Sequence, residues 1–508
     1  MMAGVLAARR TLLRAGAGFA LITGARAQVA GDPFTLGVAS GEPWSDSVVL
    51  WTRLATAPLM EGGGMAPHPV TLRWELGADA GMRTILRSGE VVAQPGDAHA
   101  VHPVVGGLDP ARTYFYRFRV GTHVSPVGRT RTAPAPGATP AIRFLNAGCQ
   151  HYEHGHFTAW KHAAAEEDID FVFHYGDYIY EYAGRTAGER GWGPIARTHH
   201  GGETHTLAEY RARYAQYRTD PDLAAAHATH PFIVTYDDHE VENNWASLIS
   251  QQDGGARHPV RVPPEAFATR AAAAFQAWYE HMPVRPAARP RSTDITAYRH
   301  LRFGRVLDLR VLDTRRFRDD QPCGDGSVLP CAAVSRPDAQ MLGAAQEAWL
   351  REGIGTSDAR WQVLGQQVFF APRRFARGTF SMDSWDGYPA ARQRLLDMFA
   401  RRPGGIILTG DVHRAWANEV ASLVEFVGTS ITSEGDGSDV QSTAAEIMAI
   451  NPHLKFNSNR RGYTLHIAST DRMEAHYRAV PFVQQPGAPL TTVAQFLTEH
   501  GSGRLERG

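Results

Sequence analysis

Residues 172–183 read VFHYGDYIYEYA, in which an apolar run ends at Gly176 and Asp177 and tyrosines then follow closely. Short apolar runs without alternation are typical of strands that are covered on both faces. Three similar runs occur elsewhere: IRFLNAG at 142–148, FIVTY at 232–236 and GIILTG at 405–410. Helical stretches such as FTAWKHAAAEE and TLAEYRARYAQYR lie between them, and the latter opens with Thr206 and Glu209 in capping-box spacing. The pattern predicts an α/β domain.

Side chains that can bind a metal follow each of these four runs. They are Cys149 after the first, Asp177 and Tyr180 after the second, Asp237, Asp238, His239 and Glu240 after the third, and Asp411 and His413 after the fourth. In open α/β sheets, ligands gather outside the carboxyl ends of the strands. Because a phenolate is a strong donor for a hard, highly charged ion, we predict a metal site with Tyr180 as its phenol. Tyr175, Tyr178 and Tyr182 are expected to pack or to support the ligands.

The remaining composition suggests at least two domains in a globular protein. The chain has 508 residues, with 52 basic and 52 acidic side chains, so its net charge does not favour nucleic acid or an anionic membrane as a partner. Between residues 33 and 133, VTLRWEL and TYFYRFRV alternate as strands do, and Tyr114 follows Leu108-Asp109-Pro110 as in a tyrosine corner. We predict a β-sandwich at 33–133, a Pro/Gly-rich linker, and the α/β domain at 140–490.

The first residues have the pattern of an export signal. Arg9 and Arg10 precede an apolar stretch, and Ala25-Arg26-Ala27 offers a cleavage site. The apolar stretch is too short to span a bilayer, and the arginine pair is of the twin-arginine type. We predict a signal peptide at 1–27 that engages the twin-arginine export machinery, and a periplasmic or secreted mature protein.

Three cysteines occur in the chain. Cys323 and Cys331 lie in the Pro/Gly-rich stretch QPCGDGSVLPC, which could close a small loop by disulfide in an oxidising compartment. Cys149 is then unpaired. Its thiol is expected either to be buried and inert or to be held by a bound group.

The motifs together resemble the alkaline phosphatase D family, the PhoD-like phosphatases. GDYIY fits the G-D-x-x-Y form of metallophosphoesterases with a tyrosine-bound ferric ion. FTLGVASGEPWSDSVVLWTRL, NAGCQHYEHGHFTAW, TYDDHEVENNWA, VLDTRRFRDDQPCGDG, SMDSWDGYPAAR, LTGDVHRAW and VEFVGTSITSEGDG follow in the family's order. The resemblance implies a calcineurin-like metallophosphoesterase sandwich with an N-terminal fibronectin/Ig-like β-sandwich domain. It also implies an exported enzyme that cleaves small phosphate monoesters and diesters with Fe³⁺ and Ca²⁺.

The resemblance also implies roles for individual residues. The ferric ligands would be Cys149, Asp177, Tyr180 and His413, with Asp177 bridging to calcium, and Asp238 and Asp411 would complete the calcium side. The wider superfamily has G-N-H-E/D where this chain reads Y-D-D-H-E. The division of duties among Asp237, Asp238, His239 and Asn243 therefore stays open, with Asp238 and His239 as first choices.

These assignments predict in-line attack on phosphorus by a metal-bound hydroxide. Asp177 and His239 are the predicted catalytic residues, and the sequence does not decide whether His239 protonates the leaving group or binds metal. Arg315 and Arg392 are the predicted substrate-binding residues, each as a clamp on the phosphate.

Two alternatives remain. A purple acid phosphatase also joins a fibronectin-like domain to a G-D-x-x-Y site. Its last motif should read G-H-x-H where this chain has Gly410-Asp411-Val412-His413, and its first should present Asp in place of Cys149. The second alternative is a surface-binding protein with a structural metal, which would require broken ligand motifs, and none is broken.

Overall fold

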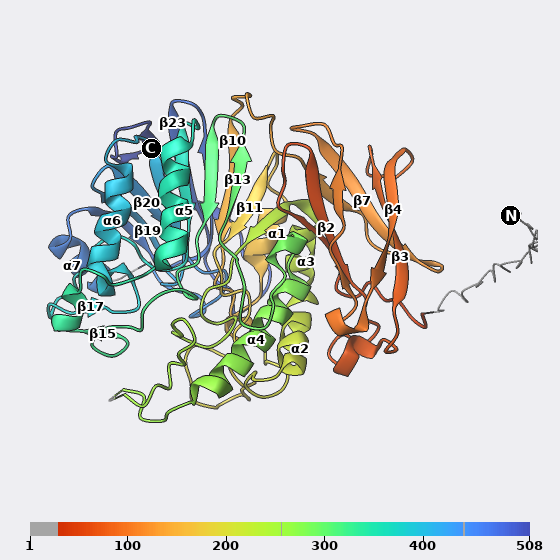
Figure 1. Cartoon of the computed structure of the whole chain (residues 1–508), viewed down its shortest axis with the longest axis horizontal. Helices are drawn as coiled ribbons and strands as arrows, with labels where there is room; N and C mark the ends of the chain where they lie inside the picture. Colours follow the sequence, from red (N-terminus) through yellow and green to blue (C-terminus); the bar gives the residue numbers. More distant parts are fainter. Residues whose placement is uncertain (1–28, 256, 440–441) are drawn as a thin grey trace, which may run out of the picture.

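Two β-sheets pack face to face at the centre of the molecule, with helices on both outer faces (Figure 1). The computed structural model describes residues 29–255, 257–439 and 442–508. The predicted signal peptide at 1–27 lies outside these residues. This layered arrangement confirms the predicted α/β class, since parallel strands from both sheets alternate with helices along the chain.

The first sheet has eleven strands. In spatial order they are β25 (Glu506–Arg507), β24 (Thr491–Glu499), β23 (Arg472–Val480), β22 (Arg461–Ala468), β10 (Ile142–Ala147), β11 (Phe171–His174), β12 (Pro231–Val234), β1 (Val38–Gly41), β2 (Ser47–Arg53) and β5 (Ala100–Val101), with β6 (Val104–Gly106) also paired to β2. Strands β10, β11, β12 and β1 run parallel, so the carboxyl ends of β10, β11 and β12 share one edge.

The second sheet has seven strands. They are β13 (Arg299–Phe303), β14 (Leu307–Val311), β16 (Trp361–Gly365), β18 (Gly405–Thr409), β20 (Leu423–Val427), β19 (Ala415–Val420) and β21 (Leu454–Ser458). Here β14, β16, β18 and β20 are parallel. A short ladder joins β15 (Ser327–Val328) to β17 (Phe380–Ser381).

Three apolar layers hold the sheets and helices together. The layer between the sheets joins Phe144, Phe171 and Phe173 of the first sheet to Leu309 and Val363 of the second. The first sheet is covered by α1 (Thr158–Ala164), α2 (Leu207–Arg218), α3 (Pro221–Thr229) and α4 (Pro264–His281). The second is covered by α5 (Gly343–Thr356), α6 (Pro389–Phe399) and α7 (Ser442–Ile450). The predicted capping box at the start of α2 is present.

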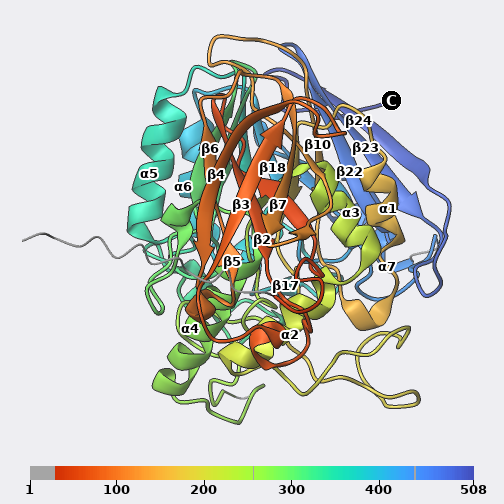
Figure 2. The same cartoon turned by 90° about the vertical axis from the view of Figure 1, so that its right-hand side faces the viewer.

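The N-terminal region forms a β-sandwich that shares a sheet with the rest of the molecule. Its second sheet contains β4 (Ile85–Ala93), β3 (Val70–Gly77), β7 (Thr113–Val120), β8 (His123–Val124) and β9 (Gly128–Arg131). Figure 2 shows β4, β3 and β7 facing the viewer. The tyrosine corner forms, because the Asp109 N–H donates to the Tyr114 hydroxyl oxygen at 2.8 Å. The other half of this sandwich, β1 and β2, continues the central sheet through the β1–β12 pair. Pairing with β1 covers the edge that β12 would otherwise expose.

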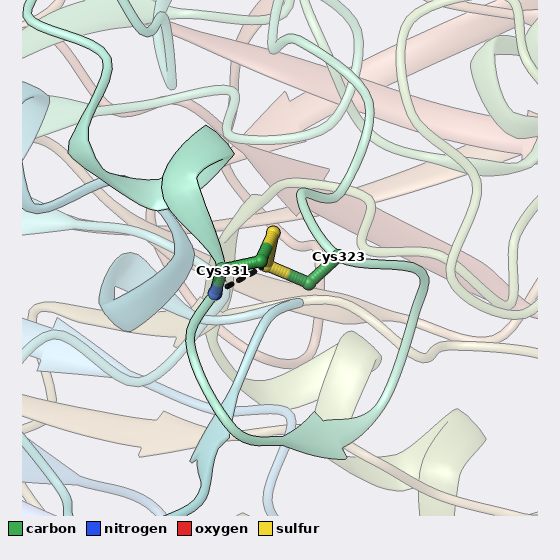
Figure 3. The surroundings of a disulfide bond; sticks show 2 residues. All are labelled: Cys323 and Cys331. Carbon is green, nitrogen blue, oxygen red and sulfur yellow. Dashed lines mark hydrogen bonds between the residues drawn. A yellow bond between two sulfur atoms is a disulfide. The ribbon is translucent and has the colours of Figure 1, made fainter.

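The predicted disulfide between Cys323 and Cys331 is confirmed (Figure 3), with 5.8 Å between the two Cα atoms. The Cys331 N–H also donates to the Cys323 sulfur at 3.0 Å. Cys149 is a free, buried thiol. Across the part of the chain that the structure describes, none of the helices combines the length and apolar character that a membrane crossing requires.

Candidate active site

The metal-binding side chains predicted from the four strand ends lie together at one edge of the two sheets. They fall into three groups whose ligand atoms lie within 4.8 Å of one another: Cys149, Asp177 and His413; Asp177, Asp238 and His239; and Asp237, Asp238 and Asp411. Five of the six predicted metal ligands, Cys149, Asp177, Asp238, Asp411 and His413, therefore belong to one continuous cluster, in which Asp177 joins the first two groups and Asp238 the last two.

Tyr180 lies on the same side of Asp177 as the thiol. Its hydroxyl is 2.8 Å from Asp177 Oδ2, 3.0 Å from His413 Nε2 and 2.7 Å from Ser433 Oγ. Burial, and then the charges of Asp177 and Cys149, raise the pKa of Tyr180 well above its ordinary value. Burial and neighbouring carboxylates likewise raise the pKa of Cys149. Both groups keep their protons unless a cation compensates the negative charge.

Three carboxylate oxygens show that the residues fit a cation. Asp177 Oδ1, Asp237 Oδ2 and Asp238 Oδ1 are buried and accept no hydrogen bond. An unpaired buried carboxylate oxygen is costly, and buried charges in proteins are paired or coordinate metals. These three oxygens all belong to the cluster, so a metal ion would satisfy them.

The backbone at the strand ends is unusual. Cys149, Asp177, Asp411 and His413 have φ angles of 52°, 54°, 67° and 53°. Non-glycine residues rarely adopt this left-handed region, which costs on the order of 1 kcal/mol or more each and persists where surrounding structure enforces it. Four of the six predicted ligands are thus presented by strained turns, a signal that residue types alone do not reveal.

Glu240 fixes the turns that follow β11 and β12, the first of which is the strained turn at Asp177. Its carboxylate accepts hydrogen bonds from the backbone N–H groups of Asp177 at 3.1 Å, Tyr178 at 2.6 Å and Asp237 at 2.9 Å. Burial and then the nearby Asp177 charge raise its pKa to about 8. Sequence reasoning grouped Glu240 with the possible metal donors, but its oxygens are turned to the backbone. It positions the loops after β11 and β12.

Tyr175 explains part of the tyrosine-rich stretch. Its buried ring packs against Gly148, Gly410 and Gly428, where an added Cβ would come within 2.4, 2.1 and 2.5 Å of ring atoms. Its hydroxyl donates to the carbonyl of Thr429. The three glycines directly follow β10, β18 and β20, which belong to both sheets. The Tyr175 ring therefore packs the carboxyl ends of these strands together. The packing role predicted for Tyr175 is confirmed.

Arg315 occupies a different place from the one predicted. Its side chain is 0% exposed, and its guanidinium donates to Asp237 at 2.5 Å, to both oxygens of Asp383 at 2.9 Å and to Asp411 at 3.1 Å. Since its donors are engaged by carboxylates beneath the cavity, none is directed at a substrate. Three buried aspartates and the partly exposed Asp411 hold this guanidinium, so the phosphate clamp predicted for Arg315 stays a prediction that no contact here supports.

Arg392 also lies away from the site. Its guanidinium donates to Asp386 at 2.7 Å and to the carbonyl of Phe370 at 3.2 Å. It does not line the cavity above the cluster. Asp386, in the short 3-10 helix that precedes α6, determines where this side chain points, and Arg392 has no contact that supports its predicted role.

A cavity of about 350 Å³ opens above the cluster. Its walls are Asp177, Tyr182, Trp192, Asp238, His239, Asn243, Asn244, Asp411 and His413. The Nδ1–H of His239 donates to Glu181 at 2.8 Å, so Nε2 is the nitrogen available to a bound molecule. Burial alone would lower the pKa of His239, but the charges of Glu181 and Asp238 raise it well above its ordinary value.

The disulfide loop reaches this cavity through Asn244. The Asn244 backbone N–H donates to Asp238 Oδ2 at 2.9 Å, and its side-chain amide donates to Asp325 at 2.7 Å. Asp325 lies between Cys323 and Cys331 in the chain. Asn243 is held by its own N–H, which donates to Glu181 at 2.9 Å.

Sequence reasoning missed Ser433, Asp383, Glu181 and Trp192. A signal existed for the first two, because Ser433 lies in VEFVGTSITSEGDG and Asp383 in SMDSWDGYPAAR, both among the motifs that resemble the family. Trp192 lies in the stretch 184–205, which has no regular pattern of apolar residues.

Comparisons with known proteins identify the family of this chain. The profile of the PhoD-like phosphatase family matches residues 144–477, and that of the PhoD-like phosphatase N-terminal domain matches residues 20–134. Alkaline phosphatase D of Bacillus subtilis (strain 168) is 47% identical over 491 residues, covering 94% of this chain and 82% of the relative. A solved structure of PhoD superposes with a TM-score of 0.90 at 45% identity, covering 94% of this chain and 93% of that one.

A more distant structure shares the fold. Purple acid phosphatase PPD1 from yellow lupin (Lupinus luteus) seeds superposes with a TM-score of 0.53 at 14% identity, covering 91% of this chain and 73% of that one. The two matches confirm the predicted architecture, a calcineurin-like sandwich with an N-terminal β-sandwich.

Proposed function

This chain belongs to the PhoD-like phosphatase family and hydrolyses phosphoric ester bonds, and from this premise we propose that it acts on monoesters and diesters with a ferric ion and calcium. Cys149, Asp177, Tyr180 and His413 would hold the ferric ion, and Asp177, Asp238 and Asp411 would hold calcium. The two sets differ in chemistry: one includes sulfur, phenol and imidazole, and the other is all carboxylate.

The charge of the cavity wall carries the proposal. Among the described residues that line it, three are aspartates and none is arginine or lysine. A phosphate ester is itself anionic, so such a wall would repel it. Cations bound by the aspartates would reverse the sign of the field and make the cavity a phosphate site.

When bound, the ions would offset the charge of the phosphate oxygens and lower the pKa of a coordinated water. The chain's own residues supply the rest of the chemistry. Asp177 lies between the two sets and would fix their spacing. His239 lines the cavity, and its bond to Glu181 orients the ring so that Nε2 can donate a proton to the leaving oxygen.

Diesters are included because the cavity is open to solvent above the carboxylates, with Tyr182 and Trp192 at its mouth. A diester carries less charge than a monoester dianion and adds a second substituent that needs space. The open cavity has room for the second substituent, and its metal-bound aspartates would accept the lower charge of a diester.

Export is also part of the proposal. The twin-arginine pattern at residues 1–27 and the Cys323–Cys331 disulfide both suit a protein that works in the periplasm or outside the cell. Its partners would be the twin-arginine export machinery and small phosphate esters. No contact in the described residues favours the surface-binding alternative.

Elemental analysis and the visible spectrum of the purified protein test the metal assignment. We expect iron, calcium, a phenolate-to-iron charge-transfer band, and hydrolysis of both 4-nitrophenyl phosphate and bis(4-nitrophenyl) phosphate. A colourless, fully active protein that carries zinc alone would disprove the ferric and calcium assignment while leaving the phosphatase activity in place.

A further inference from the structure

Trp192 is a large apolar side chain that stands at the mouth of a charged cavity. Its side chain remains 41% exposed and lines the cavity beside Tyr182, His239 and His413. The floor is made of aspartates, which would face the phosphate group. An exposed indole makes no favourable interaction with an anionic phosphate group. Its position at this cavity therefore indicates contact with another part of the bound molecule.

The indole is held by ring contacts, two with buried histidines and two with histidines that line the cavity. It makes edge contacts with the buried rings of His154 and His151, with ring centroids 4.6 and 5.4 Å apart. It lies nearly parallel to the imidazoles of His413 and His239, at 27° and 13°, with centroids 5.4 and 6.4 Å away. The ring orientation is therefore fixed by four histidines before any substrate arrives.

The backbone around Trp192 is fixed as well. His154 Nε2 is 2.8 Å from the Trp192 carbonyl, and Arg185 donates to the carbonyls of Gly193 at 3.2 Å and Pro194 at 3.1 Å. Arg185 is itself paired with the fully buried Glu153 at 2.7 Å. Gly193 has a φ of 75°, and a Cβ there would lie 2.3 Å from the His154 ring. This part of the chain presents Trp192 in one place.

Tyr182 extends the same aromatic surface. Its ring is edge-on to Trp192 at 6.4 Å and to His239 at 5.4 Å, both measured between centroids. Planar substituents stack on such rings, and the gain does not depend on specific hydrogen bonds.

We propose that Trp192, supported by Tyr182, is the binding surface for a flat aromatic substituent that stays on phosphorus when the ester is cleaved, an aryl group or a nucleobase. The surface makes this enzyme selective for diesters whose retained substituent is aryl or nucleoside over diesters whose retained substituent is alkyl. The inference rests on the proposed function, because it requires an ester bound in this cavity.

Three diesters with the same leaving group test the selectivity. They are 4-nitrophenyl phosphates whose second substituent is methyl, phenyl or 5′-thymidyl. In Trp192→Ala we expect kcat/KM for the phenyl and thymidyl esters to fall roughly 5- to 100-fold, the effect of losing one stacked ring. The methyl ester should change less than about twofold, and Trp192→Phe should retain most of the preference.

The control variant is Trp44→Ala. Trp44 is similarly exposed, at 48%, but it packs on Arg285 away from the cavity, so this variant should leave all three esters unchanged. A loss confined to the thymidyl ester would assign the surface to nucleobases, and a loss confined to the phenyl ester would assign it to simple aryl groups. An equal loss on all three esters would overturn the proposal, since Trp192 would then only cover the metal ligands.

Calorimetric titration with phenylphosphonate and methylphosphonate separates this inference from the proposed function. Neither compound is a hydrolysable ester. Wild-type protein should bind phenylphosphonate more tightly, and Trp192→Ala should remove the difference. If the protein hydrolysed none of the esters yet kept this preference, the proposed function alone would fail. Equal binding of both compounds by wild-type protein would overturn the aromatic surface.

Discussion

On one side of Asp177, Cys149 and His413 stand on strained turns and Tyr180 Oη lies 3.0 Å from His413 Nε2, whereas the carboxylates on the other side surround a buried guanidinium. On the thiol side, raised pKa values keep Cys149 and Tyr180 neutral until a cation arrives. On the carboxylate side, Arg315 already supplies positive charge. The first side must release protons from a thiol and a phenol to take up an ion. The second side shares its oxygens with a resident cation, although burial raises the pKa of Asp411 there to about 7.

The difference suggests how one centre could hold two unlike ions. Phenol and thiol donors that have displaced their protons bind a highly charged ion strongly. Carboxylates already neutralised in part by Arg315 offer a weaker site, which suits calcium. Asp177 belongs to both sides and couples them.

The largest expected effect is therefore at Asp177. Asp177→Asn should lower hydrolysis of monoester and diester together by more than roughly 100-fold, the upper end of the loss seen for residues that only support metal ligands. Assays with 4-nitrophenyl phosphate and bis(4-nitrophenyl) phosphate measure this. Retention of diesterase activity with loss of monoesterase activity would mean two separate sites and would refute the assignment of Asp177.

Variants of the two sides should differ in their spectra. Tyr180→Phe and Cys149→Ser should weaken or abolish the charge-transfer band and lower bound iron, because each removes a donor from the thiol side. Asp411→Asn should lower bound calcium and leave the band in place. Elemental analysis and visible spectroscopy give both readings. Loss of the band in Asp411→Asn would show that the two sides are not distinct.

Arg315 should affect calcium rather than substrate. Arg315→Lys keeps the charge but loses the planar fork that bonds three aspartates, so we expect calcium affinity to fall about 10- to 100-fold. Arg315→Met should in addition destabilise the protein by about 3 to 5 kcal/mol, because it leaves buried carboxylates unpaired. Calcium titration and chemical unfolding measure these effects, and Arg392→Lys is the control. A phosphate clamp would instead raise KM with calcium binding unchanged.

The sequence predicts the parts of this centre that follow from local pattern. Apolar runs locate β10, β11, β12 and β18, and the parallel arrangement brings their carboxyl ends together. The ion pairs of Arg315 could not be predicted in this way, because its partner Asp383 lies 68 residues further along the chain. Arginine has many acidic neighbours to choose from, and only the folded chain selects among them.

The same limit applies to the N-terminal region. Its alternating strands were predicted, but the parallel pairing of β1 with β12 joins Ser40 to Pro231 and makes one sheet of two predicted domains. The boundaries at 33–133 and 140–490 remain predictions. Trp192 was missed because irregular loops carry no periodicity, and its position depends on contacts with Glu153, His154 and Arg185.

His239 should show its role through the leaving group. If its Nε2 protonates the leaving oxygen, His239→Asn should lower hydrolysis of phenyl phosphate by about 10²-fold or more. Hydrolysis of 4-nitrophenyl phosphate should fall much less, since 4-nitrophenolate leaves without a proton. Because the pKa of His239 is raised well above its ordinary value, the imidazolium should persist at neutral pH. An equal loss on both substrates, with less bound metal, would make His239 a metal ligand instead.

The smallest effect on activity is expected at the disulfide. Cys323→Ser and Cys331→Ser open a short loop, whose closure contributes about 2 to 3 kcal/mol to stability by the loop-entropy estimate. The loop holds Asp325, which bonds to Asn244 beside the carboxylate side, so activity should fall only a few-fold and mainly through weaker calcium binding. Unfolding in urea and calcium titration measure the two effects, and the charge-transfer band should be unchanged. Free-thiol counting on native, unreduced wild-type protein is the control: two titratable thiols at Cys323 and Cys331 would contradict the bridge. If the band weakened in these variants, the loop would support both sides of the centre, and the separation drawn at Asp177 would be wrong.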